Sequence, residues 1–505
     1  MNRTLRLVVS SLIVAGLLMM SGAAFVVWRL QPPTMSSPAR ADWTIRNVTL
    51  VEAGREPRPG RTIRVENGVV VEIGDRAIRG DSGPFADDLA GLYVTPGLTD
   101  LHVHYPPGVV IGNAQLWSLL LLSHGVTSIR ETGSVDGSIF VVREAIRSGE
   151  YPGPRIFACG VMLDGERPSF PSNRVVATAM EAEAAVEDMA RQGADCIKAY
   201  NMLEPEALEG ITRTAARFGL PVIGHAPHSV SFEESGIVDL QHGTGAVIVD
   251  RERVGRSDFL AADWTTMDDA RIDYVARASR DRDIAHTPTL VNARMRRLLS
   301  NERAADVAMN EDSGLRHLPR FWAGAWSAIW GAPFVPGDEQ GEARHEYFRA
   351  RQAAMTRGLH AAGVRIHAGT DTLMPFVAPG SSLLGELDEL GSAGIDPEDV
   401  WAIATSEAGH SLGLAGLGRL EVGAPADLLF LRANPAEGLD AFGEIEAVLA
   451  DGRLYRRADF EDMLSRSDVH FRGDFYSGLM GFAMGIVRNA FAPEHDDMQN
   501  FTTGG

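Results

Sequence analysis

Short apolar, strand-like runs alternate with longer helix-like stretches through the middle of the chain. The run at 196–200 follows a helical pattern at 177–194, and the run at 220–225 follows another at 204–219. A further apolar run at 364–371 has the same character. Helices of this length between short strands are typical of a parallel, wound sheet. The pattern therefore predicts an α/β fold.

The two flanks of this region have a different pattern. Residues 43–92 contain short alternating segments separated by turns, and residues 418–456 have the same character. A two-residue alternation of polar and apolar positions is typical of antiparallel strands with one buried face. We therefore expect β-structure on both sides of the α/β region.

The N-terminus carries a long apolar segment. No charged residue occurs in the 22 residues of 7–28, which are long enough to span a bilayer. We expect an uncleaved signal anchor at 1–31, with a signal peptide cut near residues 22–24 as the alternative. Both interpretations leave Arg3 and Arg6 on the cytoplasmic side and export the rest of the chain, to the periplasmic side in a bacterium.

Six residues with metal-binding side chains lie at or just after strand-like runs. They are His102 and His104 in LTDLHVHY, Lys198 in DCIKAY, His225 in PVIGHAP, His242 in DLQHG, and Asp371 in HAGTDT. Alternate residues of a strand share a face, so His102 and His104 can share one ion. Parallel β/α barrels keep their chemistry at the C-terminal ends of their strands. Imidazoles, a carboxylate and an amine that carbon dioxide could convert to a carbamate form the ligand set of a two-metal hydrolytic centre.

At these residues the chain resembles the amidohydrolase superfamily, in particular its imidazolonepropionase-like and prolidase-like branch of binuclear metal-dependent hydrolases. The resemblance covers roughly residues 42 to 455 and includes GVTSIRETG at 125–133, PGSSLLGELDEL at 379–390 and GRLEVGAPADLLFL at 418–431. It implies a TIM-like (β/α)8 barrel with a small β-sandwich built from the two flanks. We therefore divide the chain into an anchor at 1–31, a linker at 32–41, a composite β-sandwich at 42–95 and 416–460, a barrel at 96–415 with an insertion at about 291–350, and an extension at 461–505.

The resemblance also implies two divalent metal ions, usually zinc, held by these six residues. Lys198 would be carboxylated by carbon dioxide, and Asp371 would bind metal and accept a proton from the bridging water. The implied activity is hydrolysis of an amide or peptide C–N bond in a small molecule, a dipeptide or an N-acyl amino acid. A lactone or cyclic amide is the alternative substrate. A catalytically inactive, membrane-tethered binding protein is the alternative of another class.

Three further residues are weaker candidates for substrate binding. Tyr200 lies two residues after Lys198, so its phenol is expected to face the same interior, although a packed aromatic residue fits the position equally well. His228 could line the pocket or be a loop residue without a role. Arg130 follows a predicted strand and could bind a substrate carboxylate, or form an ion pair with Glu131 or another acid. We interpret four other histidines as structural: His124, His286, His367 and His410.

Composition limits the remaining possibilities. A chain of 505 residues with a net charge of −20 is unlike a nucleic-acid-binding protein, so we expect no nucleic-acid partner. Cys159 and Cys196 are the two cysteines. Both fall on neighbouring predicted strands, and we interpret them as buried thiols, with a single disulfide as the alternative.

Two regions depart from the resembling family. The insertion at about 291–350 contains Trp322, Trp326 and Trp330, which are spaced to share one helix face. We interpret them as a packed or oligomer-forming stripe, with a lid over the active site as the alternative. The C-terminal extension contains an apolar stretch at 475–491 that could contact the membrane or a second subunit of a homo-oligomer, and both possibilities stay open.

Overall fold

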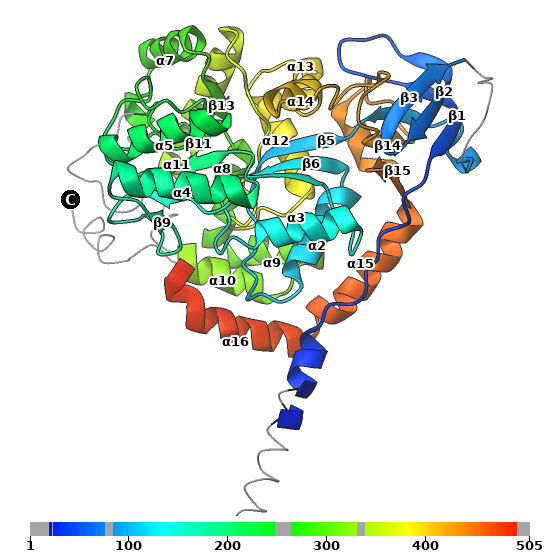
Figure 1. The fold of residues 1–505 in the computed structure, drawn as a ribbon, viewed down its shortest axis with the longest axis horizontal. Coiled ribbons are helices and arrows are strands. Elements are labelled where there is room, and N and C mark those ends of the chain that lie inside the picture. Colours follow the sequence, from blue (N-terminus) through cyan, green and yellow to red (C-terminus); the bar gives the residue numbers. More distant parts are fainter. Residues whose placement is uncertain (1–19, 23, 76–83, 248–263, 331–338, 492–505) are drawn as a thin grey trace, which may run out of the picture.

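The computed structural model describes residues 20–22, 24–75, 84–247, 264–330 and 339–491. A ring of parallel strands surrounded by helices lies beside a separate, mainly antiparallel sheet (Figure 1). The alternation of strands and helices predicted for the middle of the chain is confirmed.

The ring consists of two hydrogen-bonded arcs of parallel strands. One arc contains β5 (Leu98–Val103), β6 (Val126–Glu131) and β7 (Arg155–Ala158). The other contains β8 (Leu163–Asp164), β9 (Arg174–Val175), β10 (Ile197–Ala199), β11 (Val222–Gly224), β12 (Asp239–Gln241) and β13 (Ala285–Thr287).

The extended segment at 364–371 connects the two arcs on one side. His286 N donates to Arg365 O at 3.0 Å, and Leu101 N donates to Ala368 O at 2.9 Å. On the other side Asp195 N donates to Ala158 O at 2.8 Å. These bonds join the arcs around one interior, so the C-terminal ends of all the strands open onto the same face.

Helices cover the outside of the ring. They are α2 (Asn113–Ser123), α3 (Ile139–Ser148), α4 (Ala179–Gln192), α5 (Pro205–Phe218), α7 (Asp269–Asp281), α8 (Leu290–Arg296), α9 (Glu302–Glu311), α10 (Phe321–Trp330), α11 (Glu339–Ala361), α12 (Ser381–Ser392), α13 (Pro397–Ile403) and α14 (Ser406–Ser411). The start of α4 follows from its sequence, since the Thr178 side chain accepts a hydrogen bond from Glu181 N. It ends at Gly193, which has a φ of 83° that glycine adopts without strain.

The two β-rich flanks of the chain meet in one seven-stranded sheet. Its strands, in spatial order, are β16 (Arg453–Arg456), β15 (Ile445–Ala450), β14 (Leu428–Leu431), β4 (Tyr93–Pro96), β1 (Trp43–Leu50), β2 (Arg58–Glu66) and β3 (Val69–Gly74). The N- and C-terminal flanks are joined where β14 pairs with β4 in an antiparallel ladder. Alternate residues of these strands build a separate apolar core.

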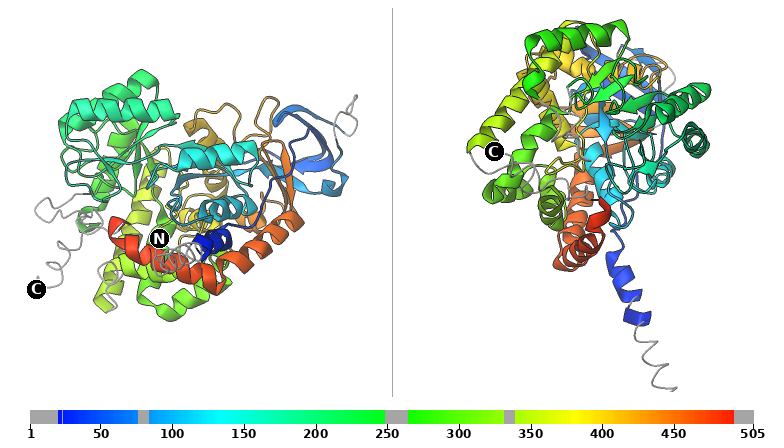
Figure 2. Two further views of the ribbon diagram at one scale, coloured as in Figure 1. Left: turned by 60° about the horizontal axis from the view of Figure 1, so that its bottom comes forward. Right: turned by 90° about the vertical axis from the view of Figure 1, so that its left-hand side faces the viewer.

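The C-terminal extension forms two helices, α15 (Arg457–Phe471) and α16 (Asp474–Phe491). Helix α16 lies along α10, and both views of Figure 2 keep these helices side by side. Within the described residues, no helix combines the length and the apolar character that a membrane span requires. Most of the expected N-terminal anchor, residues 1–19 and 23, lies outside the described part of the chain.

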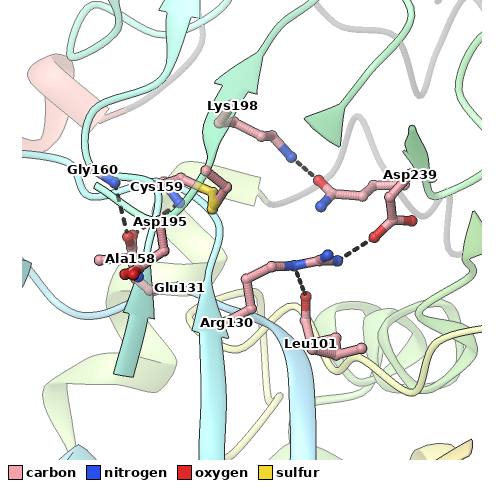
Figure 3. Close-up of a disulfide and its surroundings, with 12 residues drawn as sticks. Leu101, Arg130, Glu131, Ala158, Cys159, Gly160, Asp195, Lys198 and Asp239 are labelled. Atoms are coloured by element: carbon pink, nitrogen blue, oxygen red, sulfur yellow. Dashed lines mark hydrogen bonds and ion pairs between the residues drawn. A yellow bond between two sulfur atoms is a disulfide. The ribbon is translucent and has the colours of Figure 1, made fainter. Parts of the chain in front are cut away.

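Cys159 and Cys196 form a disulfide with Cα atoms 4.5 Å apart (Figure 3). The interpretation of these residues as free thiols is therefore wrong, and the bridge that was the alternative is present. The two cysteines meet because the ring closes between β7 and β10. Cys159 directly follows β7, and Cys196 directly precedes β10. Both residues are buried.

Candidate metal centre and its pocket

Three of the six predicted ligands form a tight triangle inside the ring. His102 Nε2 lies 3.2 Å from His104 Nε2, and each of these atoms lies 3.3 Å from Asp371 Oδ1. A tetrahedral ion with ligands at about 2.0–2.1 Å has ligand atoms roughly 3.3 Å apart. The triangle therefore has the dimensions of one face of a metal coordination shell. No metal ion is part of this structure.

The other predicted ligands border the same space. His242 Nε2 lies 3.9 Å from Asp371 Oδ2, and His102, His242 and Asp371 each offer a ligand atom within 4.8 Å of the others. The rings of His225 and His242 meet edge to face, with centroids 5.2 Å apart. Lys198 lines the pocket together with His104, His225 and His242. The structure thus brings all six residues together.

Hydrogen bonds to the far side of three imidazoles fix their orientation. His104 Nδ1 donates to the carbonyl of Gly133 at 2.8 Å. His225 Nδ1 lies 2.6 Å from Asn201 Oδ1, and His242 Nδ1 lies 2.7 Å from Thr289 Oγ1. A histidine that is held through Nδ1 presents a neutral Nε2 with its lone pair toward the centre, which is the form that binds metal.

The pKa shifts of His102 and Asp371 also suit metal binding. Burial lowers the pKa of His102 to about 3, so its imidazole is neutral at physiological pH. Burial opposes ionisation of Asp371, but the charge of His242 and the hydrogen bond from His102 outweigh it and hold the pKa of Asp371 well below its usual range. Asp371 is therefore ionised at physiological pH, and the His102 imidazole is neutral.

Lys198 is almost completely buried on β10, and its Nζ donates to Gln241 Oε1. Burial lowers the pKa of Lys198 to about 7. A substantial fraction of this amine is therefore uncharged at neutral pH, which is the form that reacts with carbon dioxide.

The backbone at two of the ligands is strained. His242 and Asp371 have φ values of 58° and 64°, in the left-handed region that side chains other than glycine rarely adopt. Thr289, which lies against His242, has a φ of 52°. Such conformations cost free energy, and they cluster at functional sites, where they fix the direction of a side chain.

Four residues that support the centre were not singled out in the sequence: Asn201, Gln241, Thr289 and Asn292. Asn292 donates to Asp371 Oδ2 and fixes the carboxylate. Asn201, Gln241 and Thr289 lie at or just beyond strand ends, which is the same positional signal that identified the predicted ligands, whereas Asn292 lies in α8. Their amide and hydroxyl groups bind metal poorly, so a search for ligand chemistry passed over them.

The weaker candidates have different positions. Tyr200 lines the pocket, and its ring stacks on His225 with centroids 4.2 Å apart. His228 does not belong to the described pocket lining; its backbone N–H donates to Asn201 O. The expectation that Arg130 binds a substrate carboxylate is not supported, because Arg130 is buried and donates to Asp239 and to Leu101 O (Figure 3). The ion pair that was the alternative is present.

The space above the centre, counted together with the open solvent at its mouth, is about 940 Å³. Residues from the ends of most ring strands form its floor, and α10 and α16 supply much of its wall. Trp322, Trp326 and Trp330 all line it. The insertion therefore borders the pocket. This is the position expected if the insertion forms a lid over the active site, which was the alternative interpretation.

A parallel ring with a histidine and aspartate cluster at its strand ends is the architecture of a barrel hydrolase. The chain belongs to the amidohydrolase family, whose model, described as "Amidohydrolase family", matches residues 93–455. Membership makes the protein a hydrolase that acts on carbon–nitrogen bonds and places it in a superfamily that typically depends on metal.

Solved structures show a similar fold. A bottromycin amidohydrolase is 25% identical with a TM-score of 0.66, over 88% of this chain and 92% of that one. A putative prolidase from Bifidobacterium longum is 23% identical with a TM-score of 0.60, over 85% and 99% of the two chains. An ochratoxinase from A. niger is 18% identical with a TM-score of 0.58, over 83% and 96%. A search of curated proteins finds no match.

Proposed function

We propose that the protein is a metal-dependent hydrolase that cleaves an amide or peptide C–N bond in a small molecule. The observation that carries this proposal is the triangle of His102 Nε2, His104 Nε2 and Asp371 Oδ1, whose edges of 3.2 and 3.3 Å fit one divalent ion. Its position at the strand ends of a TIM-like (β/α)8 barrel supports the same conclusion.

We assign His102, His104 and Asp371 to one ion, and His225 and His242 to a second. Lys198, carboxylated by carbon dioxide, would contact both. Bound divalent ions, zinc being usual in the resembling branch, would lower the pKa of water and polarise the substrate carbonyl. Asp371 would hold the proton taken from water and pass it to the leaving amine. Asn292 keeps the Asp371 carboxylate in the orientation that this transfer requires.

A dipeptide or an N-acyl amino acid is the proposed substrate. Two structures that resemble this chain in fold support it, the putative prolidase and a Xaa-Pro dipeptidase with bound methionine, the latter with a TM-score of 0.57. A dipeptide and an N-acyl amino acid both offer an amide carbonyl to the proposed metal centre. The tests below use both substrate classes and add a lactone.

We also propose that the catalytic region is exported and stays attached to the membrane through the N-terminal segment. The apolar residues 7–28 and the disulfide between Cys159 and Cys196 support export, because disulfides persist in oxidising compartments. Fractionation of cells that express the full chain, with protease added to intact spheroplasts, tests this proposal. Protection of the barrel from the protease would refute it.

Metal analysis combined with activity tests the enzymatic proposal. The full-length protein is purified, its zinc, manganese, cobalt and iron are quantified, and it is assayed against dipeptides, N-acyl amino acids and lactones before and after chelation. We expect bound metal, and activity that chelation removes and metal restores. His104→Gln should lose both, whereas His317→Gln, a buried histidine that pairs with Asp468 outside the pocket, should keep both. Protein without metal that hydrolyses nothing would favour the inactive binding protein.

A further inference from the structure

One face of α10 forms an apolar wall over the centre. Trp322, Trp326 and Trp330 follow one another at intervals of four residues, so they lie on one helix face and line the pocket together with Ile329. The rings of Trp322 and Trp326 stack with centroids 5.7 Å apart. This face is therefore rigid as well as apolar.

Hydrogen bonds fix the tryptophans in place. Trp326 Nε1 donates to Leu373 O at 3.0 Å, and Trp322 Nε1 donates to Asn113 Oδ1 at 3.0 Å. The N–H group of each of these two indoles is thus bonded to another protein group. Only carbon surface of these two rings remains for a ligand.

The apolar surface continues to the proposed metal ligands. Trp330 meets the edge of Phe170 with centroids 6.0 Å apart, Phe170 meets Tyr200 at 6.0 Å, and Tyr200 stacks on His225 at 4.2 Å. Rings therefore line an unbroken path from the helix to the reaction centre. A substrate group that binds against these rings therefore lies close to the proposed metal ligands.

Helix α16 closes the wall from behind. Helix α16 contacts α10, its Met480 and Met484 are buried in the same apolar core as Trp322 and Trp326, and Met484 lines the pocket. Thioether side chains adapt to aromatic and aliphatic ligands of different shape. Two regions that lie outside the strand and helix repeat, the insertion and the C-terminal extension, thus supply the same surface.

Polar groups are few apart from the centre itself. Among the described residues that line the pocket, the polar side chains beyond the proposed ligands and the tryptophan indoles are Tyr200 and Ser172. These described lining residues include no arginine, and no carboxylate other than Asp371. A small dipeptide with both ends charged would leave its charges poorly solvated against this wall.

We propose that the pocket selects substrates in which the scissile amide carries a bulky apolar group, an aromatic ring or an alkyl chain, bound against the wall of α10 and α16. This inference rests on the proposed hydrolase function and specifies its substrate class. The apolar group binds by leaving water, while the amide carbonyl is directed toward the His104 and Asp371 side of the pocket.

Two substrate series test the inference. The first is N-acylglycine with acyl chains from acetyl to dodecanoyl, and the second is N-acetyl-glycine, -leucine, -phenylalanine and -tryptophan. Burial of each methylene is worth about a fourfold gain in binding. We therefore expect kcat/KM to rise by about that factor per methylene until the pocket is filled, in at least one series. Equal kcat/KM along both series, or a preference for small dipeptides, would overturn the inference and leave the hydrolase function intact.

Variants locate the selective surface. Ile329→Asn places an amide on the wall, and we expect it to flatten the dependence of kcat/KM on chain length while the metal content stays unchanged. Met484→Ser, a polar substitution on α16, should flatten the dependence on chain length in the same way. Trp401→Phe is the matched control, because Trp401 is a buried aromatic residue packed against Phe442 outside the pocket. An unchanged chain-length dependence in both wall variants would refute the proposed location.

A binding assay separates this inference from the proposed function. The chelated protein is titrated with dodecanoate and with acetate, and tryptophan fluorescence is recorded. We expect saturable quenching with dodecanoate that Ile329→Asn weakens at least tenfold, and none with acetate. Binding without hydrolysis of any amide by the metal-loaded protein would refute the hydrolase function but support the apolar site. Absence of dodecanoate binding would overturn the apolar site whatever the activity.

Discussion

Arg130→Met tests whether this arginine holds the barrel together or binds substrate. Arg130 and Asp239 belong to β6 and β12 and meet inside the ring, with side chains 6% and 3% exposed. Asp239 also accepts hydrogen bonds from Thr287 Oγ1 at 2.9 Å and from His367 Nδ1 at 3.0 Å. The substitution keeps most of the side-chain volume but leaves the Asp239 carboxylate without its main countercharge.

The expected loss of stability follows from that burial. Removing one partner of a buried ion pair costs about 3–5 kcal/mol, because the remaining charge is left in a medium of low dielectric constant. The bonds from Thr287 and His367 favour the lower half of this range. Against a total unfolding free energy of about 5–15 kcal/mol, the change is large enough to measure.

The pH dependence provides a second signature. Burial would raise the pKa of Asp239, but the charge of Arg130 outweighs it and lowers the pKa below the usual range. A carboxyl with a lowered folded-state pKa contributes stability above its unfolded pKa of about 3.9, and that contribution is lost as the pH falls further. In Arg130→Met the buried Asp239 loses the charge that lowers its pKa, so it can protonate at a higher pH than in wild type. The difference in stability between wild type and Arg130→Met should therefore be largest near neutral pH and shrink on acidification.

Urea unfolding followed by circular dichroism measures the change. Arg147→Met is the control, since Arg147 forms its ion pair with Glu144 at an exposed site, and its unfolding midpoint should not move. The double variant Arg130→Met with Asp239→Leu should lose less stability than the sum of the single variants, because it leaves no buried charge. An unchanged midpoint for Arg130→Met, with a raised KM for a substrate carboxylate, would refute the structural role.

Three other substitutions give distinct readouts. Asp371→Asn should lower kcat at least 100-fold and reduce bound metal while the unfolding midpoint stays within the wild-type range; unchanged metal content would contradict its assignment as a ligand. Replacing Cys159 and Cys196 by alanine should destabilise the protein by about 3–4 kcal/mol in the chain-entropy account, since 37 residues separate them, and equal urea midpoints would refute a formed bridge. Burial raises the pKa of Glu386 from 4.5 to about 8, so wild-type stability should fall as the pH rises between these values, by up to about 1.4 kcal/mol per pH unit. Glu386→Gln should remove that slope, and an identical slope in both proteins would show that Glu386 is already ionised.

The ligand set could be predicted from sequence because strand geometry constrains it. His102 and His104 share a face through a two-residue period, and the other ligands end successive segments of a repeating unit. A parallel ring gathers all strand ends on one face, so the order along the chain was enough to place Lys198 near Asp371, 173 positions later. This placement follows without specifying which side chains contact one another.

The contacts inside the ring could not be predicted in this way. Arg130 and Asp239 are separated by 109 positions, and nothing in either segment identifies its partner. Glu131, the neighbour of Arg130 in sequence, was offered as a possible partner, but adjacent strand residues point to opposite faces, and Arg130 pairs with Asp239 instead. The bridge between Cys159 and Cys196 likewise depends on how the two arcs close, which local periodicity does not specify.

The insertion and the C-terminal extension, which lie outside the repeat of strands and helices, both border the pocket. The strand ends supply mainly the proposed metal ligands to the floor of the pocket, which provide little apolar surface for recognising a substrate. Recognition then depends on whatever covers that floor, and here α10 and α16 cover it with tryptophan and methionine. Because α16 packs on α10 from the C-terminal extension, removing the extension would leave the metal ligands in place and expose the back of the wall. Under the two proposals, catalysis and selectivity are carried by different parts of the chain. The ligand motifs indicate the reaction class, and the insertion and the extension supply the surface that is proposed to select the substrate.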